Sequence, residues 1–348
     1  MPDVPLSVGD SSGAVVHTID QDGVARFAYV RFENEPGRLL LDVDPKAGFL
    51  TVYACAHSGK WIRWLFQKYT DQYSAGLWVF ISAHSMRRVS NRLWEFEVVE
   101  ELVGGGVTGV VWIEGSEGGK SIDSPSDTVT EVFIGDGHGD EYPDSVTTGA
   151  SKDPVVIADG KPVLLDDGGT RIECRSIYIM QRSVLLRDRT PKQTLTNSTP
   201  WCRQLKVWAF ENQSMRMSVH ASILAQFTGK VYLPLICTST GFTGGIRKPS
   251  GKVLAIPYDV DSFPDDNNAS GVTGMLMWGS IGMVEIEVGN YKSAGELNID
   301  LHRIRTDGGY HKNYWLCGSG MVGVGTKIHQ RLNPGDTVSR EFTVKFTI

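Results

Sequence analysis

The chain has 348 residues and a formal net charge of −6, with 41% hydrophobic and 21% charged residues. This apolar content excludes wholesale disorder, and the negative charge gives no basic field for a nucleic-acid backbone, so nucleic acid is not an expected partner. The length suits two ordinary domains or one large β-domain, and the 39 glycines favour many short strands joined by turns.

The N-terminal segment and the cysteines bear on where the chain is made. The segment MPDVPLSVGDSSGAVV lacks a basic stretch followed by an apolar core, so we expect no signal peptide. No run of about 18 uncharged apolar residues occurs, so we expect no membrane span. No CxxC pair is present, so the sequence does not support a zinc site built on thiolates. The odd number of cysteines favours free, mostly buried thiols made in a reducing cytoplasm, and a single disulfide is the alternative. The cysteines are Cys55, Cys174, Cys202, Cys237 and Cys317.

Alternation of apolar and polar residues is the dominant pattern along the chain. It predicts half-buried antiparallel strands at ARFAYVRF (25–32), RLWEFEVV (92–99), RQLKVWAF (203–210), MRMSVHASI (215–223) and VEIEVGNY (284–291). Turn chemistry separates such runs, for example at ENEPG (33–37), DDGG (166–169) and NPGD (333–336). The segment GKWIRWLFQKYTDQY (59–73) fits either an amphipathic helix or an aromatic-rich strand. We therefore predict an all-β fold, an antiparallel β-sandwich or jelly roll.

Two polar segments suggest a domain boundary. GSEGGKSIDSPSDT (115–128) and SVTTGASKD (145–153) are rich in small residues, and each fits a linker between two sandwiches or a long loop within one. We predict two packed β-domains, an N-terminal one at 1–125 and a glycan-recognising sandwich at 126–348.

The loop VFIGDGHGDEYPDS (132–145) crowds Asp136, His138, Asp140 and Glu141. Imidazole and carboxylates suit acid–base or metal chemistry, but the remaining ligands of a calcium loop are absent, and a glycine-permitted turn explains the same pattern. We predict a shaped loop at the rim of a glycan groove, with His138 and Glu141 as contacts, no metal site and no cofactor.

The segment TRIECRSIYIMQRS (170–183) places Arg171, Glu173 and Arg175 on one face of a strand. Guanidinium groups bind carboxylates bidentately, so this row can orient a uronate, with Glu173 as a further glycan contact. The alternative is a set of cross-strand ion pairs on a solvated sheet face. His220, in MRMSVHASI, is a candidate base or an ordinary strand histidine.

The segment HRIRTDGGYHKNYWLCG (302–318) gathers aromatic and hydrogen-bonding side chains around a DGG turn. Rings that stack on sugar C–H faces beside polar groups are typical of glycan sites, so Tyr310, His311 and Trp315 are predicted contacts. A hairpin tip that closes the end of a sandwich core is the alternative.

Three of these motifs together resemble jelly-roll polysaccharide lyases of the alginate-lyase type. RIECR (171–175), SVHAS around His220 and NYKSAG (290–295) follow the order of the lyase strands, although SVH replaces the Gln-Ile-His triplet and the last motif is incomplete. The resemblance implies β-elimination beside a uronate carboxylate, with Arg171 or Arg175 as neutraliser and His220 as base. A tyrosine such as Tyr314 would be the acid; Tyr291 and Tyr310 are alternatives.

The succession of strands in the second half is similar to β-sandwich modules of phage tail-fibre proteins. Three features carry this similarity: the loop at 132–145, where His-Gly is followed by acidic residues, the strand KVYLPLI (230–236), and the Pro-Gly-Asp turn before REFTVKFTI (340–348). This resemblance implies a receptor-binding or structural tail protein that recognises cell-surface polysaccharide. It also implies a homo-oligomer, a trimer, or assembly with other virion proteins, located in the virion or outside the cell after cytoplasmic synthesis. A glycoside hydrolase using Asp140 and Glu141 is less favoured, because adjacent strand residues point to opposite faces.

Overall fold

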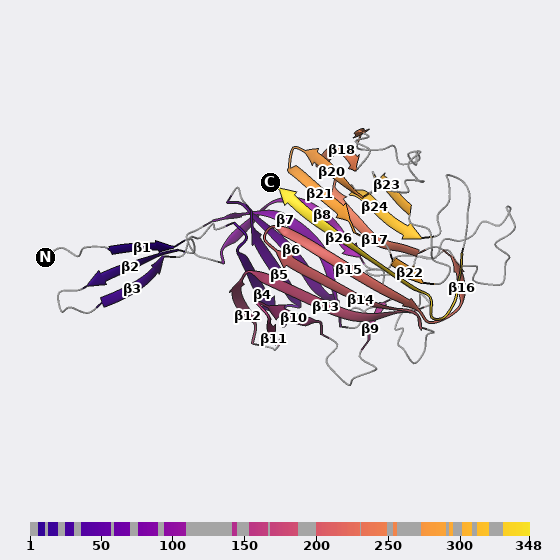
Figure 1. Ribbon diagram of the computed structural model, residues 1–348, viewed down its shortest axis with the longest axis horizontal. Coiled ribbons are helices and arrows are strands. Elements are labelled where there is room, and N and C mark those ends of the chain that lie inside the picture. The colour runs from indigo at the N-terminus through magenta and orange to yellow at the C-terminus, as the bar shows by residue number, and fades with distance from the viewer. Residues whose placement is uncertain are drawn as a thin grey trace.

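A computed structural model describes the protein over residues 6–10, 13–19, 25–30, 36–56, 59–69, 76–89, 94–108, 141–144, 153–165, 168–186, 200–229, 231–248, 253–255, 273–289, 292–294, 301–307, 312–319 and 330–348. Every regular element in these ranges is a β-strand, and the two large sheets pack face to face (Figure 1). The predicted all-β sandwich is therefore confirmed. The segment that fitted a helix or a strand is a strand, Trp61–Tyr69.

Two antiparallel sheets form the sandwich. The 9-stranded sheet contains, in spatial order, β12 (Thr170–Cys174), β4 (Leu39–Asp44), β5 (Phe49–Cys55), β6 (Trp61–Tyr69), β7 (Leu77–Arg88), β8 (Phe96–Thr108), β17 (Val231–Ser239), β24 (Lys312–Ser319) and β23 (Leu301–Asp307). The 12-stranded sheet contains β11 (Lys161–Val163), β10 (Val155–Ala158), β13 (Ser176–Leu186), β14 (Pro200–Glu211), β15 (Ser214–Ile223), β26 (Thr337–Thr347), β21 (Gly282–Val288), β20 (Gly274–Gly279), β18 (Phe242–Lys248) and β19 (Val253–Ala255), with β22 (Lys292–Ala294) beside β26 and β9 (Glu141–Pro143) beside β13.

Two smaller sheets complete the described strands. The first contains β1 (Leu6–Asp10), β2 (Gly13–Ile19) and β3 (Ala25–Val30), and it lies at the N-terminal side of the sandwich (Figure 1). The second pairs β16 (Phe227–Gly229) with β25 (Gln330–Leu332). No helix in the described part of the chain is long and apolar enough to cross a membrane.

Aromatic side chains join the two sheets in the core. Trp64 of β6 is fully buried, and its ring centroid lies 5.8 Å from that of Phe210 on β14 and 5.4 Å from that of Phe346 on β26. Phe66, two residues further along β6, meets Trp208 edge to face at 5.2 Å. Large rings bury the most apolar area per residue, so these contacts contribute strongly to holding the two sheets together.

Strands from both halves of the sequence share the 9-stranded sheet. β12 pairs with β4, and β17 pairs with β8, although each pair is far apart along the chain. The predicted boundary between residues 125 and 126 falls in 109–140, outside the described residues, and strands on either side of it build one sheet and one core.

Local predictions of turns and thiols agree with the structure where it describes them. In the NPGD turn, Gly335 has a φ of +96°, and the backbone N–H of Asn333 donates to Asp336 Oδ2 at 2.9 Å. Cys55, Cys174 and Cys202 are buried and in the thiol form, as predicted. Burial raises the pKa of the Cys174 thiol to about 12, so this sulfur stays protonated at neutral pH.

Candidate functional site

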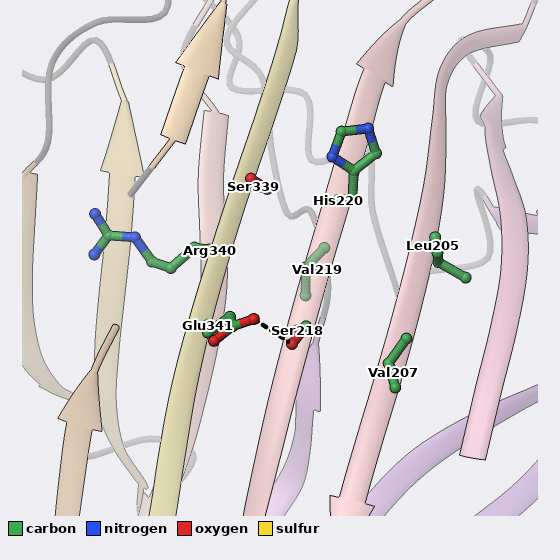
Figure 2. A pocket seen from close by; sticks show the side chains of 8 residues that line it. All are labelled: Leu205, Val207, Ser218, Val219, His220, Ser339, Arg340 and Glu341. Carbon is green, nitrogen blue, oxygen red and sulfur yellow. Dashed lines mark hydrogen bonds between the residues drawn. The ribbon is translucent and has the colours of Figure 1, made fainter. Parts of the chain in front are cut away.

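A depression lies on the outer face of the 12-stranded sheet, over β14, β15 and β26 (Figure 2). Strand alternation turns every second side chain away from the core, so three neighbouring strands present two rows of side chains there. One row is Leu205, His220 and Ser339, and the other is Val207, Ser218 and Glu341. The depression has a volume of about 230 Å³.

The depression combines an apolar side with a polar one. Leu205 and Val207 provide carbon surface from β14, while β15 and β26 provide hydroxyl, imidazole and carboxylate groups. Ser218 Oγ donates to Glu341 Oε1 at 3.2 Å, and His220 is exposed to solvent (Figure 2). Such a surface can hold a sugar ring by its C–H face and bind its hydroxyl groups.

A second polar cluster lies on the outer face of the other sheet. Tyr53, Arg63 and His84 are direct neighbours across β5, β6 and β7. Arg63 Nη2 lies 3.2 Å from His84 Nδ1. Because a guanidinium can only donate, Nδ1 must accept, and the hydrogen of the neutral imidazole is then on Nε2.

The environment of this cluster shifts the pKa of all three groups. Burial, assisted by the positive charge of Arg63, lowers the pKa of His84 to about 4, so the ring is neutral at pH 7. Burial also lowers the pKa of Arg63 and raises the pKa of the Tyr53 hydroxyl. The cluster at neutral pH is therefore one guanidinium beside two neutral hydrogen-bonding groups.

A small apolar cluster supports these groups from one side. Its buried members are Leu40, Cys55, Trp61 and Met86, with Tyr53, Trp94 and Phe96 packed against them. The rings of Tyr53 and Phe96 stack with centroids 4.6 Å apart, and that of Trp61 is tilted against Phe96 at 5.3 Å. Packing on both sides of the sheet explains why Trp61 is fully buried although it faces away from the main core.

The Arg-Glu row of β12 forms ion pairs with one residue of β4 and with the residue just before β4. Arg171 Nε lies 3.2 Å from Asp42 Oδ2, and its guanidinium lies 5.5 Å from the centroid of the Trp94 ring. Glu173 pairs with Arg38. Arg171 and Glu173 therefore form ion pairs, which is the alternative that the sequence left open for this row.

Arg175 and His220 occupy other places. Arg175 follows the last residue of β12 and is exposed, and its backbone N–H donates to Asp159 Oδ1 at 2.8 Å. His220 faces outward from the 12-stranded sheet, whereas Arg171 faces outward from the 9-stranded sheet, with the aromatic core between the two. A site shared by Arg171 and His220 is therefore not formed by the described part of one chain.

The other predicted site residues cannot be placed as side chains. His138, Tyr310 and His311 lie outside the described residues. Glu141, Tyr314 and Trp315 lie on described strands, β9 and β24, but their side chains are outside the described set. Among the side chains that are described, no three His, Cys, Asp or Glu residues gather as metal ligands.

Sequence reasoning missed Tyr53, Arg63 and His84. Each has the parity of an outward-facing strand residue, in FLTVYAC, WIRWLFQKY and LWVFISAHSMRR. That parity was visible, but the register that aligns the three positions depends on how neighbouring strands pair.

Comparison with known proteins leaves the family open. No family model matches the chain, and no curated protein matches its sequence. Among solved structures the chain is similar to a galactose mutarotase-like protein from Clostridium acetobutylicum, with a TM-score of 0.41, 9% identity and coverage of 88% of this chain and 98% of that one. It is also similar to a galactose 1-epimerase from Lactobacillus acidophilus, with a TM-score of 0.37, 9% identity and coverage of 90% and 99%.

A third similar structure is an alpha-galactosidase from Geobacillus stearothermophilus, with a TM-score of 0.40, 9% identity and coverage of 88% of this chain. The chain spans 41% of the length of that alpha-galactosidase. Likenesses at these scores and identities carry no activity or site residue over to this chain.

Proposed function

We propose that the protein recognises cell-surface polysaccharide, as a receptor-binding or structural component of a phage tail, and that glycan binds in the depression around His220. The observation that carries the proposal is the two-row arrangement there, with carbon surface on β14 and hydrogen-bonding groups on β15 and β26. The tail assignment draws on the resemblance of the strand sequence to tail-fibre modules.

An open depression on a sheet face suits a polymer better than a small molecule. A polysaccharide needs a surface that lets its chain continue at both ends, while an enclosed cavity would admit only a chain terminus or a small sugar. The rows of side chains lie on strands rather than on loops, so their spacing is set by the backbone pairing. Binding to such a surface requires little rearrangement of the protein.

Retention on immobilised polysaccharides tests the proposal. We expect the wild-type protein to bind one class of cell-surface glycan and His220→Ala to weaken that binding by about three- to tenfold, the effect of losing one hydrogen bond to a well-placed partner. Arg216→Gln is the matched control, because Arg216 is exposed on the same face of β15 but does not line the depression. No retention of the wild type on any glycan, or equal retention of His220→Ala, would overturn the proposal.

The same incubations test cleavage. A lyase releases unsaturated uronates that absorb ultraviolet light, so the absorbance should stay flat if the protein only binds. A rise with an acidic polysaccharide would overturn the binding-only function and favour β-elimination. That reaction needs a neutraliser and a base on one sugar, whereas Arg171 and His220 face away from each other across the core.

We also propose that the protein assembles as a homo-oligomer, with three copies expected for a tail fibre. Size-exclusion chromatography with light scattering measures the mass in solution. A mass of 38.2 kDa, that of a single chain, would contradict the tail-fibre assignment.

A further inference from the structure

Two arginines on the outer face of the 9-stranded sheet have a carboxylate partner, and Arg63 differs from them. Arg38 pairs with Glu173, and Arg171 pairs with Asp42. Arg63 lies in the same face and is half-buried, yet among the described residues it has no carboxylate partner. Its Nε is shielded from solvent and makes no hydrogen bond within the described part of the chain.

A half-buried guanidinium without an anion is costly to the folded protein. Burial removes water from around the cation, and a buried N–H with no acceptor loses a hydrogen bond that it would make in water. Its one observed side-chain partner is His84, a neutral acceptor. A group with this cost and this environment is a candidate for binding a ligand.

The residues next to Arg63 add further hydrogen-bond donors around its guanidinium. Nδ1 of His84 accepts a hydrogen bond from Arg63, so Nε2–H is the remaining hydrogen-bonding group of the imidazole. Tyr53 is next to Arg63 across the strands and adds a hydroxyl group. Donors around one fixed positive charge attract an anion with planar acceptor oxygens.

Aromatic rings border these donors. Tyr53 and Phe96 are stacked, and Trp94 is half-buried beside them under the Arg171 guanidinium. Rings of this kind pack against the C–H faces of a sugar, which a simple phosphate or sulfate ion does not have. The combination of fork-shaped donor and aromatic border distinguishes an acidic sugar from an inorganic anion.

We propose that Arg63 and His84, bordered by Tyr53, form a binding site for the carboxylate of a uronic acid residue in an acidic saccharide. The guanidinium holds the carboxylate oxygens, the imidazole Nε2–H donates to the same ligand, and the rings contact the sugar. No bond is made or broken at this site. It lies on the face of the sandwich opposite the depression around His220, so it goes beyond the proposed function and does not depend on it.

Calorimetric titration with two matched oligosaccharides tests the site. One probe is an oligogalacturonate and the other is the neutral oligogalactoside of the same length. We expect the wild-type protein to bind the acidic probe about tenfold or more tightly than the neutral one, since a charge-assisted bidentate hydrogen bond is lost with the carboxylate. Equal affinities, or no binding of either probe, would overturn the proposal.

Variants assign the binding to the residues. Arg63→Gln and Arg63→Lys should each weaken binding of the acidic probe by about tenfold, because the first removes the charge and the second removes the fork. Arg216→Gln changes the net charge as Arg63→Gln does, but on an exposed residue of the other sheet, and should bind as the wild type does. Cooperative unfolding and unchanged circular dichroism spectra of all variants exclude loss of fold.

Two further measurements distinguish this site from the depression around His220 and from a general anion site. Binding of the acidic probe should shift the imidazole resonances of His84 and leave those of His220 unchanged. Inorganic phosphate should bind more weakly than the acidic probe. Unchanged affinity in Arg63→Gln, or phosphate that binds as tightly as the uronate, would overturn the assignment. Loss of glycan retention in His220→Ala alone concerns only the depression on the other face.

Discussion

Acid is expected to destabilise the fold through His84. Burial and the neighbouring Arg63 guanidinium hold the pKa of His84 at about 4 in the folded protein, against 6.5 for an unperturbed histidine. Below about pH 6.5 His84 is protonated in the unfolded chain, whereas in the folded protein it becomes protonated only near pH 4. The unfolded state therefore binds more protons in this window, and stability falls as the pH falls through it.

The two pKa values set the size of the effect. Their separation of about 2.5 units, at 1.36 kcal/mol per unit, gives a loss of up to about 3 kcal/mol between pH 7 and pH 4. His84→Gln is the matched perturbation, because the glutamine carbonyl can still accept from Arg63 while the side chain cannot be protonated. All other titrating groups are common to both proteins and cancel in the difference.

Equilibrium urea unfolding at several values between pH 7 and pH 4 measures this difference. We expect the free energy of unfolding of the wild type to fall relative to that of His84→Gln, with most of the change between about pH 6 and pH 4. An NMR titration of the His84 imidazole measures the folded pKa directly. A difference between the two proteins that stays constant over the whole range would refute the reasoning.

Three other predictions concern the core and the backbone. Trp64→Ala removes the ring that joins the sheets and should cost about 3–5 kcal/mol by chemical denaturation, whereas Leu164→Ala, at a side chain that is 76% exposed, should change little. The buried Cys174 thiol, with its pKa of about 12, should resist alkylation in the folded protein and react on unfolding, as peptide mass spectrometry can show; labelling under native conditions would contradict its burial. Gly279→Ala should lower the thermal midpoint because a Cβ there would overlap the Gly241 carbonyl oxygen; an unchanged midpoint would show that the turn can shift.

Local patterns predicted the elements of the sandwich well. The alternation in RQLKVWAF and MRMSVHASI became strands β14 and β15, and the NPGD turn closed with glycine at positive φ. These features depend on residues a few positions apart, which the sequence displays directly. Local pattern alone leaves the segment 59–73 ambiguous, because the spacing of its aromatic residues fits a helix and a strand equally well. Pairing with β5 and β7 is what makes its described part a strand.

The candidate sites depended on contacts that local patterns do not contain. Arg63 and His84 are 21 residues apart, and Arg171 and Asp42 are 129 apart. Each pair meets because two strands align in one register, and a shift of one residue would turn either member to the core. Arg171 and His220 looked like partners by their order in the chain, but their strands belong to different sheets.

The sequence by itself determined that this chain forms amphipathic strands, where several of its turns fall and that its described thiols are buried, because apolar periodicity and turn chemistry act over short distances. The tertiary structure decided which strands are neighbours, which of the two outer faces each polar residue occupies, and that the two halves of the chain share one core. Strands far apart in the sequence become neighbours because their pairing buries the apolar faces of both sheets. The energy of that burial depends on the whole sandwich rather than on any one segment.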